Sequence, residues 1–224
     1  MIFLFKKILK PLIATFAITL IFTFSTFLYF SSDLPDYKIL ANYKPAVSSR
    51  VHSGEGQLIA EYAVQKRIFI PYISIPKKVI NSFLSAEDKN FFQHPGIDAK
   101  SITRAIVKNL KNITSKKRLE GASTITQQVA KNFLLTNEVS IKRKIKEAIL
   151  AFRIEKAYSK ERILELYLNQ IYLGSGTYGI AAASLEYFDK SVKELNYSES
   201  ALLAALPKAP SKYNPFRFYE EAKL

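Results

Sequence analysis

Hydrophobic and polar positions divide the chain into an apolar N-terminus, a short alternating segment and a long region of helical periodicity. Residues 12–30 contain neither a charge nor a proline, and a helix of this length extends about 28 Å, enough to cross a membrane. Alternation over residues 51–62, interrupted by Gly54-Glu55-Gly56, predicts a β-hairpin, and residues 67–72 predict a third extended piece.

Beyond Pro76 the apolar spacing is helical, and start and stop signals separate the helices. The predicted helices cover residues 77–89, 99–110, 124–135, 141–158, 160–169, 180–188 and 199–206. Asp98, Ser159 and Ser198 stand at predicted N-caps. Residues 109–121 are predicted to form a loop. The expected fold class is therefore mainly α with a small β element.

The apolar N-terminus is predicted to be a membrane anchor. Lys6, Lys7 and Lys10 precede the apolar run, so the positive-inside rule places the N-terminus in the cytoplasm and the rest on the extracytoplasmic, periplasmic side. A cleaved signal peptide is the alternative, but the run is long and residues 27–33 lack a small-x-small site. The expected order is a tail (1–10), the anchor (11–30), a linker (31–46), one domain (47–215) and a further linker (216–224).

Composition then limits the chemistry. The chain has 224 residues, 33 Lys and Arg against 19 Asp and Glu, two His and no Cys. The absence of Cys excludes a disulfide scaffold and a thiol nucleophile. A net charge of +14 suits nucleic acid, an anionic membrane or an anionic substrate. Because +11 of it lies beyond the anchor, lipid head groups or a lipid-linked anionic substrate are favoured over nucleic acid.

Three segments carry candidate chemistry. Glu87 and Asp88 end a predicted helix just before an aromatic pair and His94, and partial burial there would raise a carboxylate pKa toward that of a general base. Residues 121–131 place hydroxyls, amides and an ammonium on one helix face. Residues 142–147 contain four cations and Glu147. Each segment taken alone could be an ordinary solvent-exposed polar surface. Taken together, the three segments suggest a carboxylate base beside a pyrophosphate site.

Five blocks in order carry a family resemblance. They are EDKNFFQHPG, GASTITQQVAKN, RKIKE, KERILELYLNQIYLG and YGIAAASLEYFDK. They resemble the signature blocks of the family 51 peptidoglycan glycosyltransferases, the domain of class A penicillin-binding proteins and of monofunctional glycosyltransferases. The resemblance covers residues 47–215. It implies a lysozyme-like helical fold with a smaller, partly membrane-embedded lobe.

The resemblance also implies a reaction. The family polymerises lipid II into β-1,4-linked glycan strands, with inversion at the donor carbon and release of undecaprenyl pyrophosphate. It implies no required cofactor, although a divalent cation such as Mg²⁺ or Mn²⁺ can assist near the donor pyrophosphate. The implied partners are lipid II, a lipid-linked glycan chain, the membrane, and cell-wall elongation or division proteins.

Residue roles follow from the same resemblance. Glu87 matches the general base, and Glu147 matches the second catalytic glutamate, which supports the donor site. The residues expected to bind substrate are Ser123, Thr124, Gln127, Gln128, Lys131, Lys142 and Arg143. Asp88, His94 and Asn169 are expected to support the site.

One position departs from the family pattern. Val139 stands where many relatives have a basic residue that contacts the donor pyrophosphate. Lys142, or Arg118 in the predicted loop, would have to supply that charge. We therefore expect Lys142→Ala to weaken activity more than an average surface lysine change does.

Three alternatives remain at this point: a membrane-anchored lytic glycosidase of lysozyme-like fold, an inactive membrane-anchored scaffold, and a basic binder of membrane surfaces. Ser74-Ile75-Pro76-Lys77 is an S-x-x-K match without a following K-T-G, so penicillin binding is not expected. The end at residue 224 suggests an N-terminal fragment of a bifunctional protein whose transpeptidase domain would follow, with a complete monofunctional enzyme as the alternative.

Overall fold

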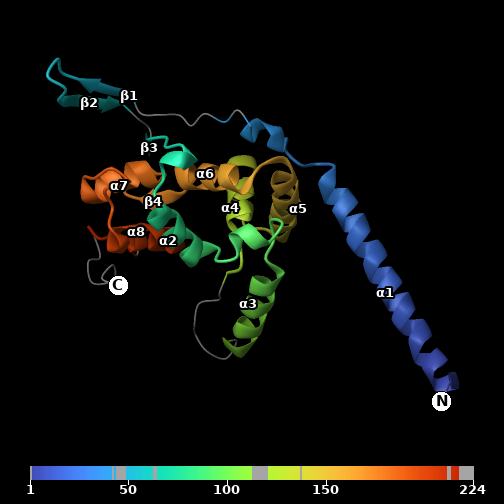
Figure 1. Ribbon diagram of the computed structural model, residues 1–224. Helices are drawn as coiled ribbons and strands as arrows, with labels where there is room; N and C mark the ends of the chain where they lie inside the picture. The colour runs from blue at the N-terminus through green and yellow to red at the C-terminus, as the bar shows by residue number, and fades with distance from the viewer. Residues whose placement is uncertain are drawn as a thin grey trace.

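The structure, a computed structural model, describes residues 2–41, 43, 49–62, 65–112, 121–136, 138–210 and 213–216. Helix α1 (Ile2–Ser31) projects from a mainly helical domain (Figure 1). Its segment Leu9–Ser31 is long and apolar enough to cross a membrane, judged by length and composition alone. The prediction of a mainly α fold with a small β element is confirmed.

Seven further α-helices are described. They are α2 (Lys77–Glu87), α3 (Ala99–Asn112), α4 (Ile125–Leu134), α5 (Ile141–Ala157), α6 (Lys160–Gln170), α7 (Ile180–Phe188) and α8 (Tyr197–Ala205). Helices α2, α4, α5, α6, α7 and α8 gather around one core, whereas α3 extends from the body of the domain toward the lower edge of the view, as does α1 (Figure 1). Short 3-10 turns lie at Tyr37–Leu40, Tyr72–Ser74, Phe91–Gln93 and Leu206–Lys208.

The β structure consists of two small sheets. Strands β1 (Ser49–His52) and β2 (Leu58–Tyr62) form the predicted antiparallel hairpin. The second sheet has the order β3-β5-β4, from β3 (Lys66–Arg67), β5 (Thr177–Tyr178) and β4 (Tyr172–Gly174). The third extended piece is therefore much shorter than predicted, and its strand partners, β4 and β5, lie in a segment for which no strand was predicted.

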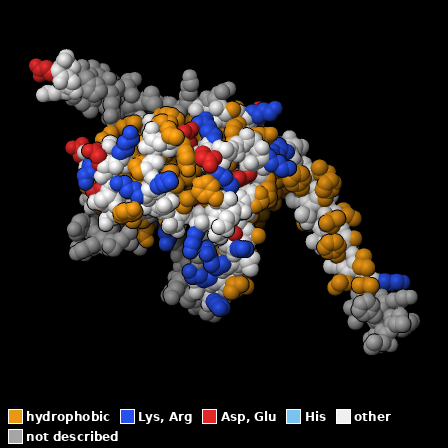
Figure 2. Space-filling view, in the orientation of Figure 1, with side chains coloured by type: hydrophobic (Ala, Val, Ile, Leu, Met, Phe, Trp, Pro, Cys, Tyr) orange, Lys and Arg blue, Asp and Glu red, His pale blue; other side chains and the backbone are white. Residues whose placement is uncertain are grey.

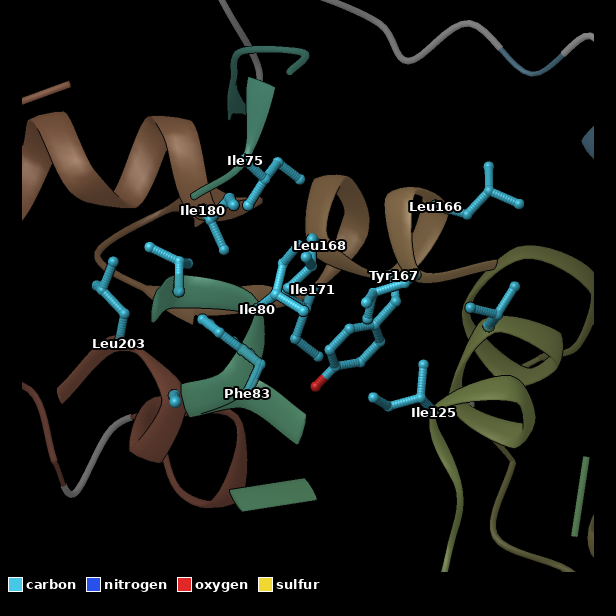
Figure 3. Packing of buried hydrophobic residues seen from close by; sticks show 14 of the residues in the cluster. Ile75, Ile80, Phe83, Ile125, Leu166, Tyr167, Leu168, Ile171, Ile180 and Leu203 are labelled. Carbon is cyan, nitrogen blue, oxygen red and sulfur yellow. The ribbon is translucent and has the colours of Figure 1, made fainter. Parts of the chain in front are cut away.

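The core lies where α2, α4 and α6 meet (Figure 3). Phe83 of α2, Ile125 of α4 and Tyr167 of α6 are each at most 1% exposed, and the rings of Phe83 and Tyr167 meet edge to face at 6.4 Å between centroids. Burial of side chains of this size stabilises the fold by about 1.5–3 kcal/mol each. Leu40, in the segment expected to be a linker, is also fully buried in this core.

Helix α6 holds the chain that enters the domain. The side-chain amide of Asn169 accepts from the backbone N–H of Ile70 and donates to its carbonyl, both at 2.8 Å. Glu165 accepts from the backbone N–H of Tyr72 at 2.7 Å. Gly179 must remain without a side chain because a Cβ there would lie 2.7 Å from the carbonyl oxygen of Asn169. The fourth sequence block, KERILELYLNQIYLG, therefore has a structural role, because it holds the backbone of the segment that enters the domain.

Three predicted helix ends are wrong. Helix α3 runs to Asn112, so residues 109–112 are helical although they were predicted to belong to a loop. Helix α8 begins at Tyr197 and is capped by Asn196 rather than Ser198, because Asn196 and Glu199 form a reciprocal capping box. Helix α2 stops at Glu87 rather than at Lys89 because Asp88 leaves the helical region at φ −155°. The difference at α2 matters most, since it turns Glu87 and Asp88 in different directions.

Candidate active site

A cleft of about 710 Å³ opens between α2, α3, α4 and α5. Its lining residues are Ala86, Glu87, Arg104, Lys108, Asn112, Gly121, Ser123, Gln127, Gln128, Lys131, Arg143, Lys144, Glu147, Pro207 and Lys208. Segments far apart in the sequence therefore share one concave site, as binding sites in proteins generally do.

Glu87 is the last residue of α2 and is partly buried at the wall of this cleft. Burial raises the pKa of its carboxyl above the ordinary value for glutamate, and the negative charge of Asp88 acts in the same direction. The amide of Gln128 donates to Oε2 of Glu87 at 2.7 Å and opposes part of this rise. A carboxylate with a raised pKa is a stronger base at neutral pH.

Asp88 lies behind the cleft wall and is 6% exposed. Its carboxylate accepts from Nε2 of His94 at 2.9 Å and from the backbone N–H of Ile125 at 2.9 Å. Nδ1 of His94 accepts from the backbone N–H of Gly96 at 3.2 Å, so the proton of a neutral ring is on Nε2. Asp88 thereby ties the end of α2 to the first residue of α4.

The start of α4 is fixed from a second side. Thr124 caps α4, and its side chain and that of Gln127 form a reciprocal capping box. The hydroxyl of Thr124 also donates to the carbonyl of Gly96 at 2.6 Å. Gly96 has φ +101°, and a Cβ there would lie 2.9 Å from the backbone of Ala151 in α5. This close packing holds α4 and α5 together, the two helices that supply the cations of the cleft.

Glu147 in α5 organises the other side of the cleft. Its side chain is 3% exposed. Oε2 accepts from Nζ of Lys144 at 2.7 Å, and the same Nζ donates to the hydroxyl of Ser123 at 2.7 Å. Oε1 lies 3.1 Å from Nε of Arg143 without hydrogen-bond geometry, and neither atom has another partner among the described residues. This pair retains hydrogen-bonding capacity inside the cleft.

The cleft is strongly basic. Six cationic side chains line it: Arg104, Lys108, Lys131, Arg143, Lys144 and Lys208. The carboxylates of the lining are Glu87 and Glu147. Figure 2 shows Lys and Arg side chains gathered over the lower part of the domain, where Figure 1 places α3. Such a concave cationic surface attracts polyanionic ligands.

A family model described as transglycosylase matches residues 55–224. The chain belongs to the transglycosylase family. Penicillin-binding protein 1A of Rickettsia felis is 57% identical over 195 residues, which cover 87% of this chain and 25% of that protein. Penicillin-binding protein 1A of Aquifex aeolicus is 48% identical over 215 residues, which cover 96% of this chain and 29% of that protein.

The family resemblance found in the five sequence blocks is thus confirmed. A crystal structure of penicillin-binding protein 1A from Haemophilus influenzae matches 80% of this chain and 17% of that chain, with 26% sequence identity and a TM-score of 0.43. This transglycosylase chain spans about a quarter of the length of the curated relatives that it matches.

The transglycosylase cleft gathers most of the predicted site. Its lining includes Glu87, Ser123, Gln127, Gln128, Lys131, Arg143 and Glu147. Thr124, Asp88 and His94 lie behind its wall, where they join α2, α4 and the intervening turn. Asn169 lies on α6 and binds the backbone of Ile70, so it acts on the fold rather than on the cleft.

Thr124 and Lys142 are the two residues predicted to bind substrate whose side chains do not line the transglycosylase cleft. The side chain of Thr124 is buried in the capping box of α4, and that of Lys142 lines a second cavity, beside the end of α1. Val139, where the family pattern led us to expect a cation, is 91% exposed, and Arg118 lies outside the described residues. Lys144 faces the cleft in place of Lys142, because residues two apart point to different sides of a helix.

Sequence reasoning missed Lys144, Arg104, Lys108 and Lys208 as cleft residues. Lys144 was signalled by its place in the RKIKE block, one position after Arg143. No pattern signalled Lys208, which comes from the 3-10 turn Leu206–Lys208 after α8. Within the described ranges no three His, Cys, Asp or Glu side chains are grouped so that they could hold a metal ion.

Proposed function

We propose that this chain is a peptidoglycan glycosyltransferase that polymerises lipid II into β-1,4-linked glycan strands. The observation that carries the proposal is a single cleft with one partly buried carboxylate of raised pKa, Glu87, beside six basic side chains. A base and a polyanion site in one cavity suit transfer of a sugar from a pyrophosphate-linked donor. Family membership supports the same reaction class.

Glu87 is the proposed general base. Its carboxylate takes the proton from the 4-hydroxyl of the acceptor GlcNAc, and the oxygen attacks the anomeric carbon of the lipid-linked donor. The bond from that carbon to the pyrophosphate oxygen breaks with inversion, and undecaprenyl pyrophosphate leaves with the electron pair. The hydrogen bond from Gln128 holds one oxygen of Glu87, which leaves the other available for the acceptor.

The cations opposite Glu87 are proposed to stabilise the leaving pyrophosphate. Lys144 is held by Glu147 and Ser123, so its charge is positioned before the substrate arrives. Arg143 has an Nε donor without a hydrogen-bond partner among the described residues. Preorganised donors of this kind lower the cost of developing negative charge because little reorganisation is needed during the reaction.

A divalent cation would find few protein ligands in this cleft. The lining offers two carboxylates, Glu87 and Glu147, and the second already binds Lys144 and lies next to Arg143. These residues alone do not hold Mg²⁺ or Mn²⁺, so such an ion would need phosphate oxygens of the substrate as its main ligands. The proposed mechanism therefore uses the chain's own cations.

The membrane is proposed to present both substrates to the cleft. Helix α1 would span the membrane with its N-terminus in the cytoplasm, which leaves the cleft on the periplasmic side. Ile106, Val107 and Leu110 of α3 are 54%, 48% and 62% exposed, and Lys108 and Lys111 are their sequence neighbours. An apolar stripe flanked by lysines suits a helix at a membrane surface, so α3 is the proposed membrane-embedded lobe. Elongation or division proteins stay a prediction from the family.

The test is polymerisation of lipid II by the wild-type chain and by Glu87→Gln, with chain length read on gels. We expect wild-type glycan strands and a loss of about 10²–10⁴-fold in the variant, the range for removal of a general base. Wild-type activity in Glu87→Gln would refute the assigned base. Shortening of preformed glycan without chain growth would instead identify a lytic glycosidase, and no reaction by the folded wild type would identify a scaffold.

A further inference from the structure

A second cavity, of about 510 Å³, lies where α1 leaves the proposed membrane. It is separate from the substrate cleft except for the shared side chain of Arg143. Its lining comes from the segment after α1, the end of α4 and the start of α5: Ser32, Asp33, Leu34, Pro35, Leu134, Leu135, Thr136, Glu138, Ser140, Lys142, Arg143 and Lys146.

The cavity is fixed to the anchor. Nζ of Lys146 binds the carboxylate of Asp33 at 2.7 Å and its carbonyl at 2.8 Å, and Arg153 donates to the hydroxyl of Ser31. Because the apolar span ends at Ser31, the residues that follow it would lie at the level of the lipid head groups. The cavity would therefore face phosphates rather than hydrocarbon or bulk water.

The charges of this cavity are not all paired. Lys146 pairs with Asp33, and Arg143 pairs with Glu147. Lys142 is exposed and interacts with Asp33 at longer range, and the exposed carboxylate Glu138 also lines the cavity. Lys142 makes no hydrogen bond or ion pair with any part of the chain that the structure describes. One lysine is thus available to an anion from outside the chain.

Exposed apolar side chains near Lys142 indicate what kind of anionic molecule would bind there. Val139 and Ile141 are 91% and 82% exposed, although β-branched apolar residues are usually buried. Leu34, Leu134 and Leu135 line the cavity itself. A ligand with one phosphate and an acyl chain would satisfy both the lysine and these apolar surfaces.

We propose that this cavity binds an anionic phospholipid of the surrounding bilayer. Its phosphodiester contacts Lys142, and its acyl chain extends from the cavity over the exposed side chains of Val139 and Ile141, which lie outside the lining. The inference rests on the proposed membrane insertion of α1 and not on the proposed chemistry of the cleft. A basic residue near a membrane surface favours anionic over neutral lipid about fivefold, so one free lysine predicts a measurable preference.

The absence of tryptophan from the chain provides the assay. A Val139→Trp variant of the full chain has a single tryptophan, which is excited selectively at wavelengths longer than those that the tyrosines absorb. Reconstitution into nanodiscs with acyl-brominated lipid then reports contact through quenching. We expect stronger quenching by brominated phosphatidylglycerol than by brominated phosphatidylcholine at equal mole fraction. Ile141→Trp repeats the measurement from the next exposed position, and Ile59→Trp, on the β1–β2 hairpin, should not be quenched.

The role of Lys142 is tested in the Val139→Trp background. Lys142→Glu should abolish the preference for phosphatidylglycerol, whereas Lys156→Glu, the same change at an exposed lysine near the other end of α5, should keep it. Soluble glycerol phosphate should not change the quenching; competition by it would assign the site to a free phosphate. Absence of quenching, or a preference that survives Lys142→Glu, would overturn the proposal. No lipid II is present, so the outcome is independent of polymerase activity.

Discussion

Two adjacent residues, Glu87 and Asp88, have opposite surroundings. Glu87 faces the cleft, receives one side-chain hydrogen bond from Gln128, and has a raised pKa. Asp88 is buried behind the wall and receives hydrogen bonds from the ring of His94 and from the backbone of Ile125. Helix α2 ends between them. The carboxylate of Glu87 is left accessible in the cleft, whereas that of Asp88 joins the end of α2, the turn at His94 and the start of α4.

The difference shows how the same functional group acquires two roles. A carboxylate whose oxygens accept hydrogen bonds from several segments acts as a structural group, because it joins those segments. A carboxylate that loses water without gaining equivalent donors binds a proton more readily. Changes on either side of this division should therefore affect different measurements.

The largest expected effect is on stability, at Asp88. Asp88→Asn replaces a carboxylate that accepts two hydrogen bonds with an amide that has only one accepting atom. Either the backbone N–H of Ile125 or the ring of His94 then loses its partner, and we expect the free energy of unfolding to fall by about 2–4 kcal/mol. Denaturant unfolding of the full chain in detergent measures it. Asp189→Asn, at an exposed position after α7, is the control. An unchanged unfolding midpoint would show that Asp88 is not structural.

The next effect is on catalysis, at Lys144. Lys144→Ala removes a cation held by Glu147 and Ser123, and we expect polymerisation to fall about 10–100-fold, somewhat less than loss of a dedicated oxyanion donor. Lys142→Ala, outside the cleft, should have a smaller effect, and Lys156→Ala should have none. A larger loss at Lys142 than at Lys144 would contradict the placement of the donor pyrophosphate.

A smaller effect is expected on the pH profile. The hydrogen bond from Gln128 lowers the pKa of Glu87 against the effect of burial, so Gln128→Leu should raise that pKa further. Because the base acts only when ionised, the acidic limb of the profile of kcat/KM against pH should move to higher pH. Gln57→Leu, in the exposed turn of the β1–β2 hairpin, should leave it in place. A shift to lower pH would argue against Glu87 as the base.

The smallest effect is a gain in stability at Glu87. Since the pKa of Glu87 is raised in the folded protein, folding is favoured when this group is protonated and is penalised once it ionises above its unfolded pKa. Glu87→Gln should therefore increase the free energy of unfolding at pH 7 by about 0.5 kcal/mol. The difference should shrink as the pH falls toward 4. Destabilisation at pH 7 would contradict the stated cause of the shift.

Much of the fold could be predicted from periodicity. The helices around Phe83, Ile125 and Tyr167 carry apolar residues at helical spacing, and the β1–β2 hairpin has a glycine turn. The sheet of β3, β5 and β4 could not be predicted, because strands of two or three residues have no period to detect. The cap at Asn196 was missed because Ser198 is an equally good N-cap type, and only the reciprocal contact with Glu199 distinguishes them.

The site was predictable where one motif contains both partners. Arg143 and Glu147 are one helical turn apart, so their ion pair follows from spacing. The choice between Lys142 and Lys144 depends on which face of α5 packs toward α4. One constraint on that face is the close approach of Gly96, in another segment, to the backbone of Ala151 in α5. The hydrogen bond from Gln128 to Glu87 joins residues 41 positions apart, which a single sequence does not indicate.

The contact between Ser31 at the end of α1 and Arg153 of α5 has a mechanical consequence. Arg153 meets Ser31, and Arg143 lies ten residues earlier on the same rigid helix, which is about 15 Å of helix length. If α1 tilts, α5 should therefore move with it, and the cations that α5 contributes to the cleft should move as well. The height of the cleft above the proposed bilayer would then be set by this one helix.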